Sequence, residues 1–586
     1  MQSGDFLDKI TKNPRADTIV KGGVLVNVYT GELYQADVAI MGERILAVGD
    51  VAELTHAGTK IIDATNYYLI PGFIDAHIHM ECSKLSVTMF AKLVIPYGTT
   101  SVVSGLDQIY VVAGLNGVRD FLAEASRTPL KIFWGAPCKL PYTIPPSTVG
   151  YKFTSKEHLK SQKWKECVGL WETVKEFVLT ADPEVKRAMK LAEKNRLPVM
   201  GCAPMAGGKP LQLYAAAGVR ADHESYSAEE MLAKLRSGIL PIIRESAVAH
   251  FLKENIQLIT KYNISHDKFA FCTDDIYSAY VLEKGHLDHV VRMAVEEGVD
   301  PVKAIQMATI NCAEIYRIDH LIGSICPGRF ADILLAERLD KLKVRKVIAN
   351  GVLVASDGNM TVDIRPPKRR PYLQHTIKCR KINSKDLLIR TRYTNVSVLS
   401  MQMSSDAPFV RKKREAVLKS MDGYLMPDVE QDVLYVSVVE RYHKNGRKAT
   451  AFVSGFGLKM GAIASSTSPD DNNIICIGAD VDDMVYAINK IIENQGGQIV
   501  VNNRKIIEFL PLPIGGIVTD SEPEEVAEHE KKLDEAAREL GCGLPSPFMY
   551  MIFLSITAIP DYAITDKGLV DCNSLKVISP LLGPAK

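Results

Sequence analysis

The stretch Leu69-Ile-Pro-Gly-Phe-Ile-Asp-Ala-His-Ile-His-Met-Glu81 decides the fold. Its apolar, β-branched lead-in predicts a strand that ends at His77 and His79. Residues two apart in a strand point to the same side, so the two imidazoles can bind one cation. A bare His-x-His also fits a chance surface pair. Because a Pro-Gly pair and then a strand precede it, the pattern favours a metal site at the carboxyl end of a barrel strand.

The size and composition of the chain predict several domains of an ordinary globular protein. With 586 residues, it exceeds what one hydrophobic core can organise, so we expect two to four domains. A net charge of +1 gives no strong field to attract nucleic acid or an acidic membrane. No run approaches the ~18 apolar residues of a membrane span. We therefore expect neither nucleic acid nor a membrane as a partner.

The cysteines and the first residues predict a cytoplasmic location. The 11 cysteines are scattered without the spacing of a disulfide framework. The segment Met1-Gln-Ser-Gly-Asp-Phe-Leu-Asp8 is acidic and polar, which is unlike a signal peptide. Both features favour reduced thiols in the cytoplasm.

Two β-rich segments flank a long insert. Residues 1–70 contain short apolar strands, with a turn expected at Gly22-Gly23, and residues 326–370 repeat this pattern. The simplest account is one composite β-domain that is split by the insert. Residues 71–325 alternate apolar strands with helical patterns, which predicts a parallel α/β sheet or barrel. One of these helices should begin at Asp182, because Asp suits an N-cap and Pro183 suits the first turn.

A third region follows a short linker. Residues 366–371 combine proline with basic residues, and we interpret their charges as solvated surface. Residues 371–586 contain predicted strands at 433–439 and 473–478 and predicted helices at 482–493 and 522–540. This mixture predicts an additional α+β domain.

Further metal-ligand candidates follow other apolar runs of the insert. Glu172 could bridge two metals with its two carboxylate oxygens. Cys202 could bind zinc or iron as a thiolate, although a free cysteine after a strand is also a common core residue. His223 follows the next such run, and Asp274 and Asp275 follow a later one, where we expect them on opposite sides of the pleat.

The chain resembles bacterial adenine deaminases of the amidohydrolase superfamily over nearly its full length. The stretches that carry the resemblance are Pro71-Gly-Phe-Ile-Asp-Ala-His-Ile-His79, Ala221-Asp-His-Glu224, Cys272-Thr-Asp-Asp275, Gly285-His-Leu-Asp-His289, Met307-Ala-Thr-Ile-Asn311, Pro327-Gly-Arg-Phe-Ala-Asp332, Ser454-Gly-Phe-Gly457, Leu510-Pro-Leu-Pro-Ile-Gly515 and Thr565-Asp-Lys-Gly-Leu-Val-Asp571. The last three are similar to a C-terminal domain that most barrel amidohydrolases lack.

The resemblance implies an α/β fold with a (β/α)8 metal-dependent hydrolase barrel, a composite β-sandwich domain and an additional C-terminal α+β domain. It also implies a binuclear site for divalent metal, with manganese or iron favoured and zinc possible. We separately expect a homodimer or higher homo-oligomer, because closed symmetric assemblies are common. On the family pattern, one metal is held by His77, His79, Glu172 and Asp274, and the second by Glu172, residue 202 and His223. Asp274 and Glu172 would be catalytic, with Asp274 relaying a proton to the leaving amine. The implied substrate-binding residues are Glu81, Glu224 and Asp275.

Four segments depart from the family pattern. Cys202 stands where the family has a histidine ligand, and Gly105-Leu-Asp-Gln108 replaces an Asp-Pro-His-Glu run. Pro469-Asp-Asp-Asn-Asn473 replaces a His-Asp-x-His-Asn run, and Glu81-Cys-Ser83 replaces Glu-Ser-Ser. The first metal position is therefore intact, the second is altered, and the surroundings of the substrate are changed most.

The implied reaction is hydrolytic deamination of adenine, or of a closely related aminopurine, to hypoxanthine and ammonia. Two alternatives stay open. The same machinery opens cyclic amides or ureas of a related heterocycle, because a tetrahedral carbon forms in both reactions. A metal-binding paralogue with little catalysis is the other alternative. Ammonia release separates deamination from ring opening. If no compound of either class is turned over, the protein is the metal-binding paralogue.

Overall fold

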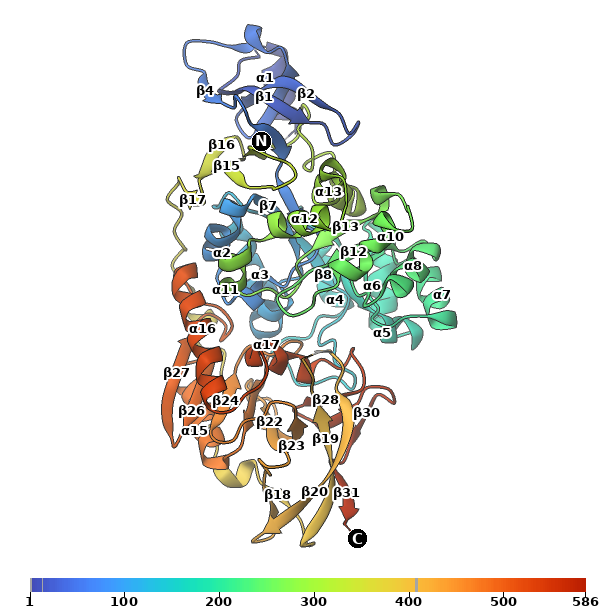
Figure 1. The fold of residues 1–586 in the computed structure, drawn as a ribbon, viewed down its shortest axis with the longest axis vertical. Helices are drawn as coiled ribbons and strands as arrows, with labels where there is room; N and C mark the ends of the chain where they lie inside the picture. Colours follow the sequence, from blue (N-terminus) through green and yellow to red (C-terminus); the bar gives the residue numbers. More distant parts are fainter. Residues whose placement is uncertain (1–2, 13, 406–408, 586) are drawn as a thin grey trace.

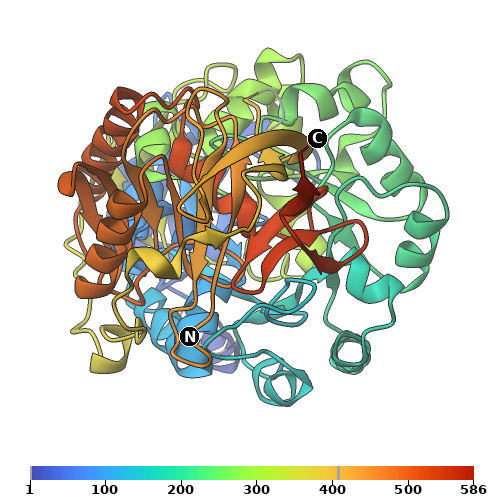
Figure 2. The same cartoon turned by 90° about the horizontal axis from the view of Figure 1, so that it is seen from below.

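The computed structural model describes residues 3–12, 14–405 and 409–585. A β-sheet region occupies one end of the long axis, an α/β barrel lies in the middle, and a second β-rich region occupies the other end (Figure 1). Seen from below, the C-terminal elements lie across the barrel (Figure 2). Across these residues, no helix combines the length and the apolar character needed to cross a membrane.

Eight parallel strands form the barrel in the order of the sequence. Closure comes from the first and last strands, where the Ala76 amide donates to the Phe271 carbonyl at 3.2 Å and Ile78 bridges Asp274. The predicted (β/α)8 barrel is therefore confirmed. Its strands are β6 (Phe73–Asp75), β7 (Thr99–Ser104), β8 (Lys131–Pro137), β9 (Cys167–Val174), β10 (Val199–Cys202), β11 (Ala221–Asp222), β12 (Leu240–Arg244) and β13 (Ala270–Cys272).

Helices between the strands cover the outside of the barrel, so β7 and β9 are buried along their whole length, including polar residues such as Thr99 and Glu172. The helix predicted at Asp182 is present, and its carboxylate accepts from the amides of Glu184 and Val185. The helices are α2 (Val87–Val94), α3 (Asp107–Ala125), α4 (Ser155–Ser161), α5 (Lys175–Leu179), α6 (Pro183–Lys194), α7 (Gly208–Ala216), α8 (Ala228–Arg236), α9 (Leu252–Asn255), α10 (Gln257–Thr260), α11 (Ser278–Lys284), α12 (Leu287–Glu296), α13 (Pro301–Met307) and α14 (Ile310–Tyr316).

One composite sheet joins the two flanking segments, as expected. β5 leads directly into β6 and pairs with β14 in antiparallel register, with Ile70 opposite Leu334. Its strands are β1 (Thr18–Val26), β2 (Leu33–Met41), β3 (Arg44–Gly49), β4 (Lys60–Asp63), β5 (Tyr68–Pro71), β14 (Ile333–Ala336), β15 (Val344–Ala349), β16 (Val352–Ser356) and β17 (Asn359–Met360), and α1 (Ser3–Lys12) precedes them. We propose 1–70, 71–325, 326–370 and 371–586 as the divisions of the chain.

The prediction of a turn at Gly22-Gly23 is wrong. β1 continues through both glycines, and its register against β2 shifts between Val20 and Gly23, which is a β-bulge. Gly22 has φ +79°, a left-handed conformation that glycine adopts without steric cost. The pair therefore bends one strand instead of separating two.

The described residues of the C-terminal region form a large mixed sheet, a small antiparallel sheet and three α-helices. Its strands are β18 (Ile389–Arg390), β19 (Asn395–Gln402), β20 (Lys412–Met421), β21 (Tyr424–Leu425), β22 (Leu434–Val439), β23 (Lys448–Ser454), β24 (Ala462–Ser465), β25 (Ile474–Gly478), β26 (Gly497–Asn502), β27 (Lys505–Pro511), β28 (Tyr562–Thr565), β29 (Gly568–Asp571), β30 (Lys576–Ile578) and β31 (Leu581–Pro584). The helices are α15 (Val481–Glu493), α16 (Pro523–Glu539) and α17 (Pro547–Ile552).

The linker before this region is only partly solvated, which corrects the interpretation of its charges. The side chain of Arg369 is 8% exposed and forms ion pairs with Glu124 of α3 and with Asp520. A buried guanidinium needs such partners, because an unpaired charge away from water is strongly unfavourable. Arg369 therefore connects the barrel to the C-terminal region.

Candidate metal centre

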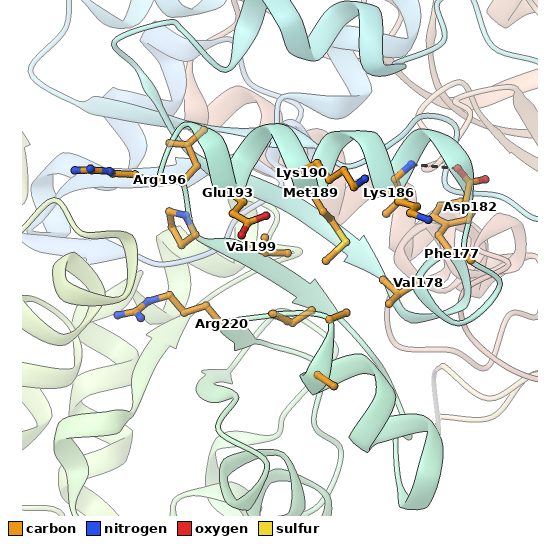
Figure 3. Close-up of a pocket in the computed structure, with 18 of the residues that line it drawn as sticks. Phe177, Val178, Asp182, Lys186, Met189, Lys190, Glu193, Arg196, Val199 and Arg220 are labelled. Atoms are coloured by element: carbon orange, nitrogen blue, oxygen red, sulfur yellow. Dashed lines mark hydrogen bonds between the residues drawn. The ribbon is translucent and has the colours of Figure 1, made fainter.

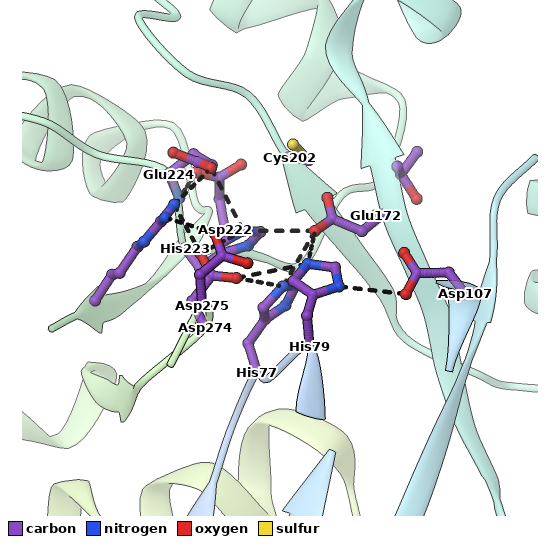
Figure 4. A network of polar contacts seen from close by, with 12 residues as sticks. His77, His79, Asp107, Glu172, Cys202, Asp222, His223, Glu224, Asp274 and Asp275 are labelled. Atoms are coloured by element: carbon purple, nitrogen blue, oxygen red, sulfur yellow. Dashed lines mark hydrogen bonds and ion pairs between the residues drawn. The ribbon is translucent and has the colours of Figure 1, made fainter. Parts of the chain in front are cut away.

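Four predicted ligands meet at the carboxyl end of the barrel (Figure 4). His77 and His79 lie just beyond β6, and the Nε2 atoms of both rings face the same two carboxylates. The Oε1 atom of Glu172 lies 3.1 Å from His77 Nε2 and 3.3 Å from His79 Nε2. The Oδ1 atom of Asp274 lies 3.6 Å and 3.5 Å from the same two nitrogens. One ion could contact all four side chains.

A second group of donors shares Glu172 with the first. The ligand atoms of Glu172, Cys202 and His223 all lie within 4.8 Å of one another, and all three residues are buried. His223 Nε2 lies 3.6 Å from Glu172 Oε1. The structure thus brings together every residue that the sequence suggested as a ligand, including the cysteine. Their roles as ligands stay predictions.

The pKa shifts of two of the histidines, and of Glu172, suit metal binding. Burial lowers the pKa of His77 and lowers that of His223 well below its usual value, so both rings are neutral near pH 7. Burial alone would raise the pKa of Glu172, but the adjacent His223 and His77 rings outweigh it and hold the pKa well below its usual value. Neutral imidazoles and an ionised carboxylate are the forms that bind cations.

The donor set fits a divalent metal. The Nε2 atom of His77 is buried and lies 3.1 Å from Glu172 Oε1, but no contact with the described residues has the geometry of a hydrogen bond. A buried polar atom without a partner is uncommon in a folded protein. Imidazole, carboxylate and thiolate donors together suit zinc, iron or manganese.

Two of the converging carboxylates stand on left-handed backbone. Glu172 has φ +46° and Asp274 has φ +58°, conformations that cost roughly 1–3 kcal/mol each and concentrate at functional sites. The turn at Asp274 ends the strand alternation, so Asp275 does not face away as expected. Both aspartates line one pocket, which corrects the sequence-based expectation of opposite sides.

Comparison with known proteins identifies the family. Residues 68–354 match the amidohydrolase family, and residues 409–576 match the adenine deaminase C-terminal domain. The chain is 54% identical to adenine deaminase 4 of Rhizobium meliloti, over 98% of this chain and 96% of that protein. It is 51% identical to adenine deaminase 1 of Desulfotalea psychrophila, over 97% of this chain and 96% of that protein. The chain belongs to the adenine deaminase family.

A solved structure, a β-aspartyl dipeptidase from Fervidobacterium islandicum, aligns with a TM-score of 0.45 at 19% identity. The alignment covers 59% of this chain and 99% of that one.

In this member of the adenine deaminase family, a buried arginine joins three carboxylates. Arg244, the last residue of β12, places Nη1 2.6 Å from Asp274 Oδ2 and 2.9 Å from Glu224 Oε1. Its Nη2 lies 3.1 Å from Asp275 Oδ2. The sequence analysis missed Arg244, although it follows an apolar run just as the ligand candidates do. The arginine fixes the orientation of Asp274 so that Oδ1 faces the histidines.

The predicted substrate-binding residues divide into two sets. Glu224 and Asp275 line the pocket beside the ligand candidates. Glu81 does not line it and is fully buried, where the Ile109 amide approaches its Oε1 at 3.5 Å. Burial raises the pKa of Glu81 to about 7, and nearby Asp107 adds to this shift. A substrate role for Glu81 stays a prediction without support from its position.

Asp107 orients one of the histidines, and the sequence analysis did not single it out as a site residue. Its Oδ1 lies 3.2 Å from His79 Nδ1, which leaves Nε2 directed at the carboxylates. Burial would lower the pKa of His79, but Asp107 outweighs it and raises the pKa well above its usual value. A carboxylate on the far nitrogen of a ligating histidine fixes its tautomer and increases its basicity.

We expect Asp107→Asn to weaken metal binding by about 10–100-fold, because such orienting contacts contribute on that scale. Titration against a competing chelator measures the change. Asp120→Asn is the matched control, since Asp120 lies on the same helix but contacts Arg370 and Tyr372 instead. Equal affinity in the two variants would contradict the role of Asp107.

The C-terminal region forms a roof over the ligands. The pocket has only about 60 Å³ of free space, against ~300–1,000 Å³ for typical ligand sites. Besides the barrel residues, it is lined by a roof that we define as Pro469, Asp470, Phe553, Ile556, Ala558 and Ile559. Apolar roof side chains exclude water from the carboxylates and histidines below.

Two buried arginines hold the roof in place. Arg411 donates to the carbonyl oxygens of Phe553, Ile556, Ile559 and Tyr562. Arg441 donates to the carbonyl oxygens of Ser466, at 3.0 Å, and Asn472, at 3.2 Å, which flank Asp470. Each guanidinium offers five donors in a rigid plane, so one side chain can fix a whole loop.

A larger cavity lies on the outside of the barrel between α6 and the end of α7 (Figure 3). It has about 930 Å³ of free space, with Met189 and Val199 on its apolar wall and Lys186 and Arg196 among its charged residues. None of the converging ligand candidates lines it. Its size therefore does not make it the reaction site.

Proposed function

We propose that the protein hydrolyses adenine to hypoxanthine and ammonia. The convergence of His77, His79, Glu172, His223 and Asp274 at one end of a barrel carries this proposal. It is supported by identities of 47–54% to curated adenine deaminases over nearly the whole chain. The proposed substrate is thus a purine base.

The proposed cofactor is a pair of divalent metals, with manganese or iron favoured and zinc possible. His77, His79 and Asp274 would hold one ion, and Cys202 and His223 the other. Glu172 lies close to donors of both groups, so it would contact both ions. When bound, the metal supplies Lewis-acid activation of water at neutral pH.

We infer that Asp274 moves the proton. Its Oδ1 faces the histidine nitrogens, and its Oδ2 is held by Arg244 at 2.6 Å. A carboxylate fixed in this way can carry the two protons of the attacking water in turn, the first to the purine ring and the second to the departing amine. The roof keeps bulk water out, which strengthens the electrostatic interactions inside the pocket.

Turnover of adenine by protein reloaded with manganese, iron or zinc tests the proposal. We expect one ammonia for each adenine consumed, with hypoxanthine as the purine product, and no turnover after chelation. A panel of cyclic amides and ureas is run beside it. Ring opening of one of these with no ammonia from adenine, or no turnover of any compound, would contradict the proposed function.

We expect Cys202→Ser to lose one of the two ions and to show weaker preference for zinc and iron, because thiolates favour these metals. Metal analysis after equilibrium dialysis measures both changes. Cys476→Ser is the control, since Cys476 is a buried free thiol in β25, outside the site. Unchanged metal content in Cys202→Ser would show that Cys202 is a core residue and not a metal ligand.

We also propose a cytoplasmic location, because all 11 cysteines are free thiols in the structure. Assembly into a homodimer or higher homo-oligomer stays a prediction.

A further inference from the structure

A roof residue brings an unpartnered acceptor into the metal pocket. Asp470 lies in the segment Pro469–Asn473, far from the barrel in the sequence, yet it lines the same pocket as His79 and Glu172. Its Oδ2 atom is buried and has no hydrogen-bond partner among the described residues. Leaving such an atom unpaired costs roughly 1–3 kcal/mol, so the position favours a ligand that supplies a donor.

The surroundings of Asp470 explain what kind of donor is missing. The basic side chains that line the pocket already have other partners: Arg244 is bound to three carboxylates, and His79 faces Asp107 and Glu172. A polar N–H of the ligand would satisfy the oxygen.

The loop is held rigidly enough for such recognition. Arg441 binds the carbonyl oxygens on both sides of Asp470, as described above. The Ser468 hydroxyl and the Ser555 hydroxyl are 2.8 Å apart, and the Ser555 hydroxyl donates to the Pro469 carbonyl at 2.6 Å. The two roof loops therefore support each other, and the position of Asp470 is fixed before a ligand arrives.

We propose that Asp470 recognises the free purine base by accepting a hydrogen bond from the N–H of its five-membered ring. This inference rests on the proposed function. Carbon 6 must face the barrel ligands for deamination, and nitrogen 9 lies across the ring system from the carbon-6 amine, so the nitrogen-9 edge faces the roof. A base that carries a substituent on nitrogen 9 lacks this N–H. Asp470 thus selects free bases over nucleosides and other 9-substituted purines.

Kinetics with adenine and 9-methyladenine test the proposal in the metal-loaded protein. We expect the parent to prefer adenine by at least ~100-fold in kcat/KM, because a site built to bind an N–H rejects analogues without it. Asp470→Leu keeps a side chain of similar size but removes the acceptor. We expect its kcat/KM for adenine to fall, mainly through KM, while that for 9-methyladenine stays within about threefold, so that the preference drops below ~10-fold.

A control variant and two contrary outcomes make the test specific. Asp471→Asn changes the neighbouring buried carboxylate, which caps the Asn473 amide at 2.9 Å and does not line the pocket. We expect this variant to change kcat/KM for adenine and for 9-methyladenine by the same factor. An unchanged preference in Asp470→Leu would overturn the inference and leave the proposed function standing, because it would show that the methyl group is excluded by shape alone. A parent that does not deaminate adenine would overturn both.

Discussion

Replacement of Asp274 by asparagine is expected to reduce kcat by about 10²–10⁴-fold, the range typical of general acid–base groups. The amide keeps the size of the side chain and can still accept from Arg244, so the fold and at least one metal should persist. It cannot carry a proton, however. The loss should appear in kcat far more than in KM, because the interaction matters most in the transition state. Steady-state kinetics with adenine and metal analysis of the same sample measure both quantities.

Asp275→Asn is the matched control for this experiment. Asp275 lies in the same pocket, but its oxygens contact Arg244 and the Cys82 thiol, which donates at 3.3 Å, whereas Asp274 also faces His77. We expect a smaller loss of kcat in Asp275→Asn than in Asp274→Asn. Equal losses in the two variants, or activity of Asp274→Asn equal to the parent, would overturn the assignment of the proton relay.

Arg411→Met is expected to destabilise the C-terminal region by about 3 kcal/mol or more, since hydrogen bonds to a charged group contribute ~1.5–3 kcal/mol each. Arg411 is fully buried, and its loss leaves four carbonyl oxygens of the roof without their donor. The same change should raise KM for adenine, because the roof side chains are no longer fixed. Urea unfolding and steady-state kinetics measure the two effects.

The control for Arg411 is Arg390→Met. Arg390 is exposed at the edge of the same region and contacts the Tyr424 ring and hydroxyl. Exposed substitutions of this kind usually change stability by no more than ~0.5 kcal/mol. If Arg411→Met unfolded at the same urea concentration as Arg390→Met, the roof would not depend on Arg411.

The features that could be predicted from the sequence are those that depend on local residue patterns. Glu172, Cys202 and His223 each follow an apolar run, and parallel strands bring their carboxyl ends to one face of a barrel, so their convergence could be anticipated. The cap at Asp182 is equally local. Arg244 also follows an apolar run, at the end of β12. Because metal ligands are anionic or neutral side chains, a cationic residue at this position did not stand out.

Other features depend on backbone detail or on distant contacts. The shared orientation of Asp274 and Asp275 follows from one left-handed residue, which strand alternation does not predict. The bulge at Gly22 arises for a similar reason, because a glycine pair supports either a turn or a bulge. Asp470 and Phe553 reach the pocket through tertiary packing alone, and no pattern near either residue indicates that it meets the barrel.

The barrel side of the pocket and the roof can change in sequence independently of each other. Every proposed metal ligand lies in the barrel, whereas the roof lies beyond residue 460, on loops anchored by their own arginines. Exchange of the loops around Asp470 and Phe553 would therefore give the enzyme a different range of heterocycles without altering how it activates water. For the design of new deaminases, these loops are the natural segments to randomise, with Arg411 and Arg441 retained as anchors.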